Sequence, residues 1–165
     1  MRALTPEPLT AEAFAPFGSV IEASDAAVKI DINQGHAVRY DRLAEIDVGD
    51  GGGGVISLFR AKPLAELVLK VFERHPLGSQ SFVPLNGRPY LVAVAPAGDF
   101  DPAAIRLFRV SGDQGVHYRK GTWHHFLLVL DEDSDFLVVD RSGPGDNCEE
   151  AELAPADQIE VRPSL

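Results

Sequence analysis

The chain has 165 residues and a formal net charge of −10, with 45% hydrophobic and 24% charged residues. This length is enough for one domain with its own hydrophobic core, and the composition excludes a wholly disordered chain. The acidic balance argues against nucleic acid as a partner, because binding to a phosphate backbone requires clustered lysines and arginines.

The charge is unevenly distributed along the chain. Residues 131–165 contain 11 acidic side chains and 2 basic ones, whereas residues 60–124 contain 9 basic and 5 acidic ones. The acidic flank favours solubility. The basic middle of the chain suits a small organic anion as ligand.

The sequence contains one cysteine, Cys148, which excludes an internal disulfide and is typical of a reducing compartment. We expect it to be a structural thiol. The first residues, 1–8, lack the apolar stretch of a signal peptide, and no run approaches the ~20 apolar residues of a membrane span. We therefore expect a cytoplasmic protein that does not bind membranes.

Short β-type runs dominate the chain after a short helix near its start. Thr10 is expected to cap this helix, over residues 11–14. Runs rich in Val, Phe, Leu and Ile, bounded by turn residues, predict strands at 54–59, 89–94, 105–110, 126–130 and 136–139. Their even spacing predicts a single all-β domain, either a sandwich or a barrel.

Two further segments do not show a clear strand pattern. Residues 64–75 fit the apolar spacing of a helix and also the alternation of a strand, and periodicity does not decide between them. The glycine-rich run 49–54 lacks the Gly-Lys-Ser/Thr ending of a phosphate-binding loop. We expect it to be a flexible connector.

Histidines provide the clearest candidates for chemistry, since their side chains exchange protons near neutral pH and bind metals. Four of the five lie in two short stretches, 73–80 and 117–125, and only His36 stands apart. We interpret His36 as structural. The adjacent His124 and His125 are expected to point to opposite faces of a strand.

The spacing within these stretches resembles that of the cupin motifs. Glu73-x-His75-x4-Gln80-x6-Gly87 is similar to the first motif, and residues 121–124 are similar to the core of the second. The resemblance implies a cupin-like double-stranded β-helix barrel over roughly residues 53–141, and favours a strand in 64–75. Glu73 occupies the position of a histidine in that motif, and Gln80 that of a carboxylate.

A metal site built on these residues would be weaker than the usual cupin site. If a divalent metal binds, its ligands would be His75, Gln80 and His124, with Glu73 beside them. A neutral amide is a poorer donor than the carboxylate it replaces. We therefore expect no strictly required cofactor.

Longer strings resemble those of the ureidoglycolate lyase family. The strings are residues 73–84 and 115–125, supported by 14–21 and 135–141, so that the resemblance extends over nearly all of one domain, 1–165. It implies cleavage of ureidoglycolate to glyoxylate and urea in allantoin (purine) degradation. It also implies a homodimer and an activity that Ni²⁺ stimulates.

This reaction needs a base for the hydroxyl proton of the substrate and an acid for the departing nitrogen. His75 and His124 are the best acid/base pair, and Tyr118 is a second candidate acid, on the other face of its strand from His117. Gln80 can hydrogen-bond the ureido group.

The substrate carboxylate needs a cation, for which Arg60 is the first candidate because it follows a predicted strand. Arg141 and Lys120 are alternatives. Asp140 is expected to pair with Arg141 or to orient a histidine.

Two other functions remain open at this point. One is a metal-dependent cupin enzyme, a dioxygenase or isomerase, acting on another small carboxylate. The other is a cupin module that binds a small molecule without catalysis, although the acidic balance of the chain and its lack of a DNA-binding segment count against a regulator.

Overall fold

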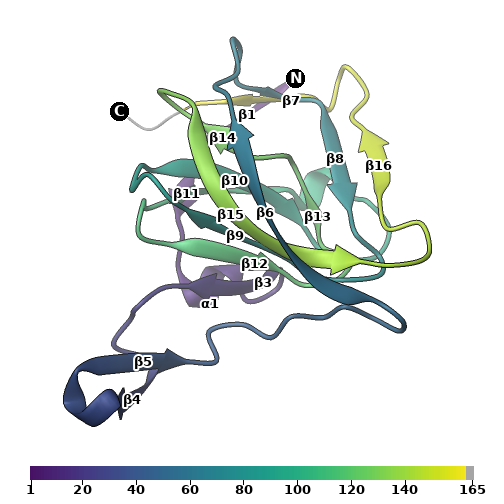
Figure 1. The fold of residues 1–165 in the computed structure, drawn as a ribbon. Helices are drawn as coiled ribbons and strands as arrows, with labels where there is room; N and C mark the ends of the chain where they lie inside the picture. Colours follow the sequence, from purple (N-terminus) through teal and green to yellow (C-terminus); the bar gives the residue numbers. More distant parts are fainter. Residues whose placement is uncertain (163–165) are drawn as a thin grey trace.

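The computed structural model describes residues 1–162, in which nearly all regular structure is β-sheet (Figure 1). The α-helix of this part, α1 (Ala11–Phe14), lies where the sequence predicts it. Thr10 caps it, because its hydroxyl oxygen accepts a hydrogen bond from the Ala13 backbone N–H at 3.1 Å. Two 3-10 turns, η1 (Asn33–Gly35) and η2 (Pro102–Ala104), interrupt loops.

A five-stranded sheet forms one wall of the barrel. Its strands lie in the order β3-β12-β9-β15-β6 and all pair antiparallel. They are β3 (Gly18–Ile21), β12 (Gly115–Tyr118), β9 (Gln80–Pro84), β15 (Ser134–Ser142) and β6 (Gly53–Ala61).

A larger sheet forms the opposite wall. Its strand order is β16-β8-β13-β10-β11-β2, and β14 also pairs with β10. The strands are β16 (Glu149–Glu152), β8 (Val71–Arg74), β13 (Trp123–His124), β10 (Tyr90–Ala95), β11 (Arg106–Val110), β2 (Glu7–Pro8) and β14 (Leu128–Val129).

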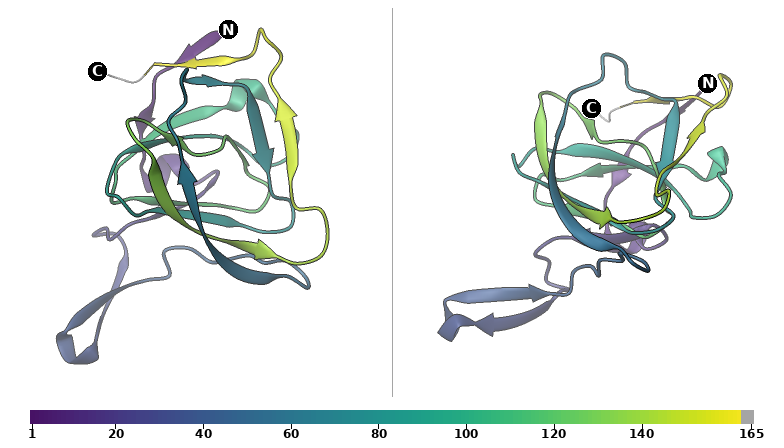
Figure 2. Two further views of the ribbon diagram at one scale, coloured as in Figure 1. Left: turned by 45° about the horizontal axis from the view of Figure 1, so that its top comes forward. Right: turned by 45° about the vertical axis from the view of Figure 1, so that its right-hand side comes forward.

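Two smaller sheets complete the chain. β1 (Arg2–Leu4), β17 (Ile159–Val161) and β7 (Val68–Leu69) lie across the end of the barrel that carries the N-terminus (Figure 2). β4 (Val28–Ile32) and β5 (Ala37–Asp41) pair only with each other and form a hairpin that stands clear of the barrel at its other end.

The strand order confirms the predicted cupin-like barrel with a short N-terminal helix. Neighbours such as β6, β15, β9 and β12 are far apart in sequence, as in the interleaved sheets of a jelly roll. The assignment of 1–165 to one domain, with its core at roughly 53–141, stays a prediction. No helix within residues 1–162 is long and apolar enough to cross a membrane.

Strand β10 separates two hydrophobic cores and is buried on both faces. Tyr90, Val92 and Val94 face the barrel interior, where α1 closes one end through Phe14. Leu91 and Ala93 face a second core under the β1-β17-β7 sheet. This double burial explains why β10 is an uninterrupted apolar run.

The ambiguous segment 64–75 forms two short strands, β7 and β8, as the cupin resemblance favours. The glycine run 49–54 is not a loose connector. A Cβ on Gly52 would lie 2.0 Å from the Val48 carbonyl oxygen, and Gly49 has a φ of +59°. These glycines therefore permit close backbone packing.

Candidate active site

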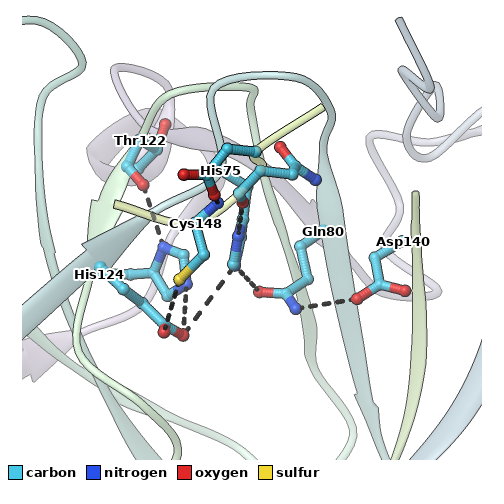
Figure 3. A network of polar contacts seen from close by, with 9 residues as sticks. His75, Gln80, Thr122, His124, Asp140 and Cys148 are labelled. Atoms are coloured by element: carbon cyan, nitrogen blue, oxygen red, sulfur yellow. Dashed lines mark hydrogen bonds and ion pairs between the residues drawn. The ribbon is translucent and has the colours of Figure 1, made fainter. Parts of the chain in front are cut away.

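Four strands bring the candidate residues to one place inside the barrel. Glu73 on β8 is the direct cross-strand partner of His124 on β13, and Tyr118 on β12 is the partner of Gln80 on β9. Residues paired in this way share one face of a sheet. His75 follows two residues after Glu73, and its ring centroid lies 5.1 Å from that of His124 (Figure 3).

His124 is almost completely buried, with 1% of its surface exposed. Its Nδ1 lies 3.0 Å from the Thr122 carbonyl oxygen, which only accepts, so Nδ1 carries a proton. Its Nε2 has no hydrogen-bond partner within residues 1–162 and lies 3.4 Å from Glu73 Oε1. Tyr118 stacks on the ring with centroids 4.4 Å apart. His124 is therefore held rigidly, with one nitrogen left for chemistry.

His75 is fixed at both ring nitrogens. Its Nδ1 donates to the Asn147 carbonyl oxygen at 2.7 Å, and its Nε2 lies 3.0 Å from Gln80 Oε1 (Figure 3). Gln80 in turn donates from Nε2 to Asp140 Oδ2 at 3.1 Å. Because Asp140 takes the amide N–H of Gln80, the amide oxygen is the atom that faces His75. Both ring nitrogens of His75 therefore face oxygen atoms of the protein.

Glu73 lies between the two histidines as the central anion of the site. The nearby His124 lowers the pKa of the Glu73 carboxyl, with a smaller contribution from His75, against the opposing effect of burial. The carboxyl is therefore ionised at neutral pH. Burial raises the pKa of Tyr118 far above its usual value, so its hydroxyl stays protonated. Tyr118 can donate a hydrogen bond here, but it does not ionise.

A cavity of about 370 Å³ opens over this cluster. Glu73, Tyr118 and His124 contribute to its wall, together with Phe82 from the barrel interior. The volume is in the range of small-molecule sites. This is the place where a substrate reaches the buried residues.

Two cations, Arg60 and Lys62, also line the cavity. Arg60 donates to both carboxylate oxygens of Asp135, at 2.7 and 2.9 Å, which neutralises it. Lys62 has no acidic partner within 4 Å in the part of the chain that the structure describes. Lys62 is therefore the cation of the cavity that remains available to an anion.

The structure does not bring the two other predicted carboxylate ligands to this cavity. Lys120 lies 3.5 Å from Asp47 Oδ2, in a separate surface hollow beside His117. Arg141 donates to the carbonyl oxygens of Val48 and Pro144, at 2.8 and 2.7 Å. Arg141 thus holds the 48–52 segment against β15. Neither residue pairs with Asp140, whose partner is Gln80.

Gln80 also differs from its predicted role. It is 5% exposed, and both ends of its amide are already bound within the protein. It contacts His75 and Asp140, and it does not line the cavity. The structure therefore places Gln80 behind the site, where it positions His75.

The other histidines divide between the two faces of the fold. His117 points away from Tyr118, as predicted, and its Nδ1 lies 2.7 Å from Ser81 Oγ. His124 and His125 point to opposite sides, as predicted: His124 stacks on Tyr118 of the barrel interior, whereas the His125 ring packs on Phe72 of the second core. Both residues still contribute to the wall of the cavity. His36 is exposed at the hairpin tip.

Several residues of the cavity were not found from the sequence. Lys62, Phe126 and Leu127 are among those that contribute to its wall. Phe126 is 45% exposed, although its position in an apolar run favours burial. Lys62 belongs to no motif, and its one signal is its place directly after a strand that ends at the cavity.

The donor set fits a divalent metal in part. One ligand atom from each of Glu73, His75 and His124 lies within 4.8 Å of the others, and the unpartnered His124 Nε2 faces this point. Two imidazoles and one carboxylate are a common set for divalent ions. His75 would have to release its contact with Gln80 to take part. Cys148 Sγ lies 3.8 Å from Glu73 Oε2, and burial raises the pKa of this thiol, which suits the expected unreactive cysteine.

Known proteins are similar to this chain over nearly its whole length. A family model described as ureidoglycolate lyase matches residues 1–161. The ureidoglycolate lyase of Burkholderia mallei (strain NCTC 10229) is 55% identical over 155 residues, covering 93% of this chain and 91% of the relative. That of Stutzerimonas stutzeri (strain A1501) is 48% identical over 166 residues, covering 99% and 97%.

One solved structure in the comparison is a dTDP sugar isomerase from Desulfovibrio desulfuricans G20. It has a TM-score of 0.47 and 18% identity, and the match covers 86% of this chain and 89% of that one. The assignment rests on the family match over residues 1–161 and on the relatives at about half identity. The chain belongs to the ureidoglycolate lyase family.

Proposed function

We propose that this protein is a ureidoglycolate lyase that releases urea from ureidoglycolate and leaves glyoxylate, in allantoin degradation. The observation that carries the proposal is the pair of Glu73 with the buried His124, with His75 beside it, at the inner end of a cavity sized for a small molecule. The family membership supports the same reaction.

The charges of the cavity orient the substrate. Glu73 is an anion at the inner end, so the substrate carboxylate is repelled from there, and Lys62 at the rim is the available cation. We place the carboxylate at Lys62 Nζ and the carbinol and ureido groups next to Glu73 and His124. Tyr118, with its retained proton, can donate a hydrogen bond to an oxygen of the substrate.

The bond changes then need one proton acceptor and one proton donor. His124 Nε2, which has no hydrogen-bond partner in residues 1–162, takes the carbinol proton, and Glu73 stabilises the resulting imidazolium. The carbinol oxygen forms the aldehyde C=O of glyoxylate, and the C–N bond breaks. His75, whose ring centroid lies 5.1 Å from that of His124, protonates the departing nitrogen to give urea once its Nε2 leaves the contact with Gln80.

The family resemblance implies stimulation by nickel, and the same cluster of residues contains candidate ligands for the ion. Glu73, His75 and His124 would hold the ion, and Gln80 would be a weaker contributor. A bound divalent ion supplies Lewis-acid polarisation of a substrate oxygen. The same cluster supports the second candidate function, a metal-dependent cupin enzyme on another small carboxylate.

We also propose a cytoplasmic location and a homodimer. The free Cys148 supports a reducing compartment, and the family resemblance supports the dimer. A carboxylate of low molecular mass is the expected partner of the cavity.

The test of the function is release of both products from ureidoglycolate. Purified protein is expected to form urea and glyoxylate in equal amounts, faster with Ni²⁺ than with a chelator. Absence of turnover under both conditions would overturn the lyase assignment. Stoichiometric tightly bound iron or manganese, with turnover of another carboxylate only, would favour the metal-dependent alternative.

A further inference from the structure

Cys148 approaches the cluster of Glu73, His75 and His124 from a loop that neither cupin-like motif includes. Its Sγ lies 3.8 Å from Glu73 Oε2, and Nε2 of His124 lies 3.4 Å from Oε1 of the same carboxylate. Figure 3 shows Cys148 and the two histidines gathered around this point. The thiol and the imidazoles therefore converge on the carboxylate of Glu73.

Asn147 fixes the loop that carries Cys148. Its backbone carbonyl oxygen accepts a hydrogen bond from Nδ1 of His75 at 2.7 Å, and its side-chain Oδ1 accepts one from the backbone N–H of Leu77 at 2.8 Å. Directly after Cys148 the chain enters β16, which pairs with β8. The thiol is therefore held on both sides of its position in the chain, and it is not placed by a free tail.

The two histidines are oriented as metal-binding imidazoles are. Nδ1 of His75 donates to the Asn147 carbonyl oxygen, and Nδ1 of His124 faces the Thr122 carbonyl oxygen. A histidine that binds a metal through Nε2 holds its other ring N–H in a bond of this kind. Nε2 of His124, on a side chain that is 1% exposed, has no hydrogen-bond partner within residues 1–162. Since buried polar atoms are nearly always paired, this atom itself points to a ligand beside Glu73.

The spacing of the donor atoms fits a single ion. With metal–ligand bonds of ~2.0–2.3 Å, neighbouring ligand atoms of a tetrahedral ion lie about 3.3–3.8 Å apart. The contacts of Glu73 with His124 and with Cys148, at 3.4 and 3.8 Å, are in this range, and Nε2 of His75 lies 4.0 Å from Glu73 Oε1. The side chain of Cys148 is exposed, so a change of its rotamer can bring Sγ toward the histidines.

We propose that Cys148 is a thiolate ligand of the divalent metal that Glu73, His75 and His124 would hold. The inference rests on the metal-stimulated form of the proposed function. On coordination the S–H bond breaks, its proton passes to the solvent, and the sulfur donates an electron pair to the ion. The unreactive thiol of the metal-free chain and a ligating Cys148 are therefore compatible.

The charges around Cys148 also favour a cation. Glu150 lies directly opposite Glu73 in the pairing of β16 with β8, and like charges in such a position destabilise a sheet. One ligand atom from each of Glu73, Cys148 and Glu150 lies within 4.8 Å of the others. Among residues 1–162, no lysine or arginine nitrogen lies within 4 Å of either carboxylate. A divalent ion at this point offsets their repulsion.

A thiolate ligand changes which metal the site prefers. A carboxylate with two imidazoles accepts several divalent ions, whereas a thiolate favours soft or borderline ions over hard ones. We therefore expect the site to bind Ni²⁺, Co²⁺, Zn²⁺ and Cd²⁺ in preference to Mg²⁺ and Mn²⁺. Replacement of Cys148 by serine should reduce this preference, because a hydroxyl is a hard donor.

Absorption spectroscopy tests the ligand directly, because Cys148 is the single cysteine of the sequence. Reduced full-length protein titrated with Co²⁺ is expected to develop a sulfur-to-cobalt charge-transfer band that saturates at one equivalent. Cys148→Ser should lose the band and bind Co²⁺ roughly ten-fold or more weakly by calorimetry. His36→Ala, at the exposed hairpin tip, should keep both. Absence of the band in the folded wild type, or equal Co²⁺ affinity in Cys148→Ser, would overturn the proposal.

Two further variants locate the ion that gives the band. Glu73→Gln and His124→Ala each remove a ligand of the cluster and leave Cys148 in place. Both are expected to lose the band at one equivalent of Co²⁺. A band and a Co²⁺ affinity that stay unchanged in both folded variants would place the thiolate-bound ion away from the cluster and would contradict the proposal.

Competition and turnover complete the test. Cd²⁺ is expected to displace Co²⁺ from the wild type, whereas a large excess of Mg²⁺ is not, and displacement by Mg²⁺ would contradict a thiolate ligand. Urea release from ureidoglycolate, measured on the same samples, separates this inference from the lyase function. A band without urea release would support the role of Cys148 and contradict the lyase function alone. Urea release that Ni²⁺ stimulates, in a protein without the band, would contradict the role of Cys148 alone.

Discussion

The Nε2 atom of His124 lies 3.4 Å from Oε1 of Glu73, its direct cross-strand partner, and has no other partner within residues 1–162. A buried polar atom without a hydrogen bond costs free energy of folding, commonly ~1–3 kcal/mol. The site retains this atom on a residue that contributes to the cavity wall. The pair therefore has the properties of a base held ready, with a counter-ion for the charge it gains.

Removal of the His124 imidazole is expected to affect catalysis more than folding. His124→Ala should lower kcat by roughly 10²–10⁴-fold, because it removes the proton acceptor. The variant also loses the stacking on Tyr118, so a Tm decrease of a few degrees is expected alongside. Steady-state kinetics and thermal unfolding check both values. A folded His124→Ala enzyme with near-wild-type kcat would remove His124 from the mechanism, and His36→Ala serves as the surface control.

Lys62 and Lys120 allow a matched test of carboxylate binding. Lys62→Met is expected to raise KM by roughly 10- to 100-fold with a smaller change in kcat, because a hydrogen bond to a charged group contributes about 1.5–3 kcal/mol. Lys120→Met removes the same charge from a different hollow. It should leave KM unchanged. The opposite pattern, with KM raised by Lys120→Met alone, would assign carboxylate binding to Lys120, one of the candidates predicted from the sequence.

Asp140 is expected to act through Gln80 on His75. Asp140→Leu removes the acceptor of the Gln80 N–H, so the amide can turn and His75 loses its fixed neighbour. We expect kcat to fall about ten-fold with KM nearly constant. Asp140→Asn still offers an oxygen to that N–H and should keep most of the activity. Equal loss in both variants would show that the charge of Asp140, and not its acceptor oxygen, is what matters.

The pH dependence of stability provides a test that is independent of substrate. Burial lowers the pKa of His125 to about 4, against an ordinary value near 6.5 in the unfolded chain. Between these two pH values the unfolded chain binds a proton that the folded chain does not. The contribution of His125 to the free energy of unfolding is therefore greatest above pH 6.5. It decreases as the pH falls toward 4, by up to roughly 3 kcal/mol.

Denaturant unfolding at several pH values measures this slope. His125→Gln should make the slope between pH 6.5 and 4 shallower, since the substituted side chain does not titrate. His36→Gln, at the exposed hairpin tip, should keep the wild-type slope. A His125→Gln slope identical to the wild type would assign the acid sensitivity to another group.

Much of the fold could be predicted from the local pattern of apolar residues. The segment 64–75 is an exception with a clear physical cause. The segment 64–75 resembles a helix because β7 ends at Leu69 and β8 begins at Val71. Leu69 and Phe72, three residues apart, both enter the core under the β1-β17-β7 sheet. The break at Lys70 shifts the alternation and produces a helical spacing without a helix.

The site was only partly predictable, because its polar contacts depend on pairing between distant strands. The cupin-like spacing identifies His75, Gln80 and His124 in advance. It does not show that Arg60 meets Asp135, which depends on the register of β6 and β15. Nor does it show that Lys62 lies at the cavity rim, since that follows from where β6 ends.

The most direct measurement is urea release from ureidoglycolate by Glu73→Gln, an isosteric change that removes only the charge at the centre of the cluster. With wild-type protein measured in parallel, the scheme predicts turnover in the wild type and a kcat at least 100-fold lower in the variant, with native circular dichroism. Wild-type kcat in a folded Glu73→Gln enzyme would contradict the claim that the Glu73–His124 pair performs the reaction.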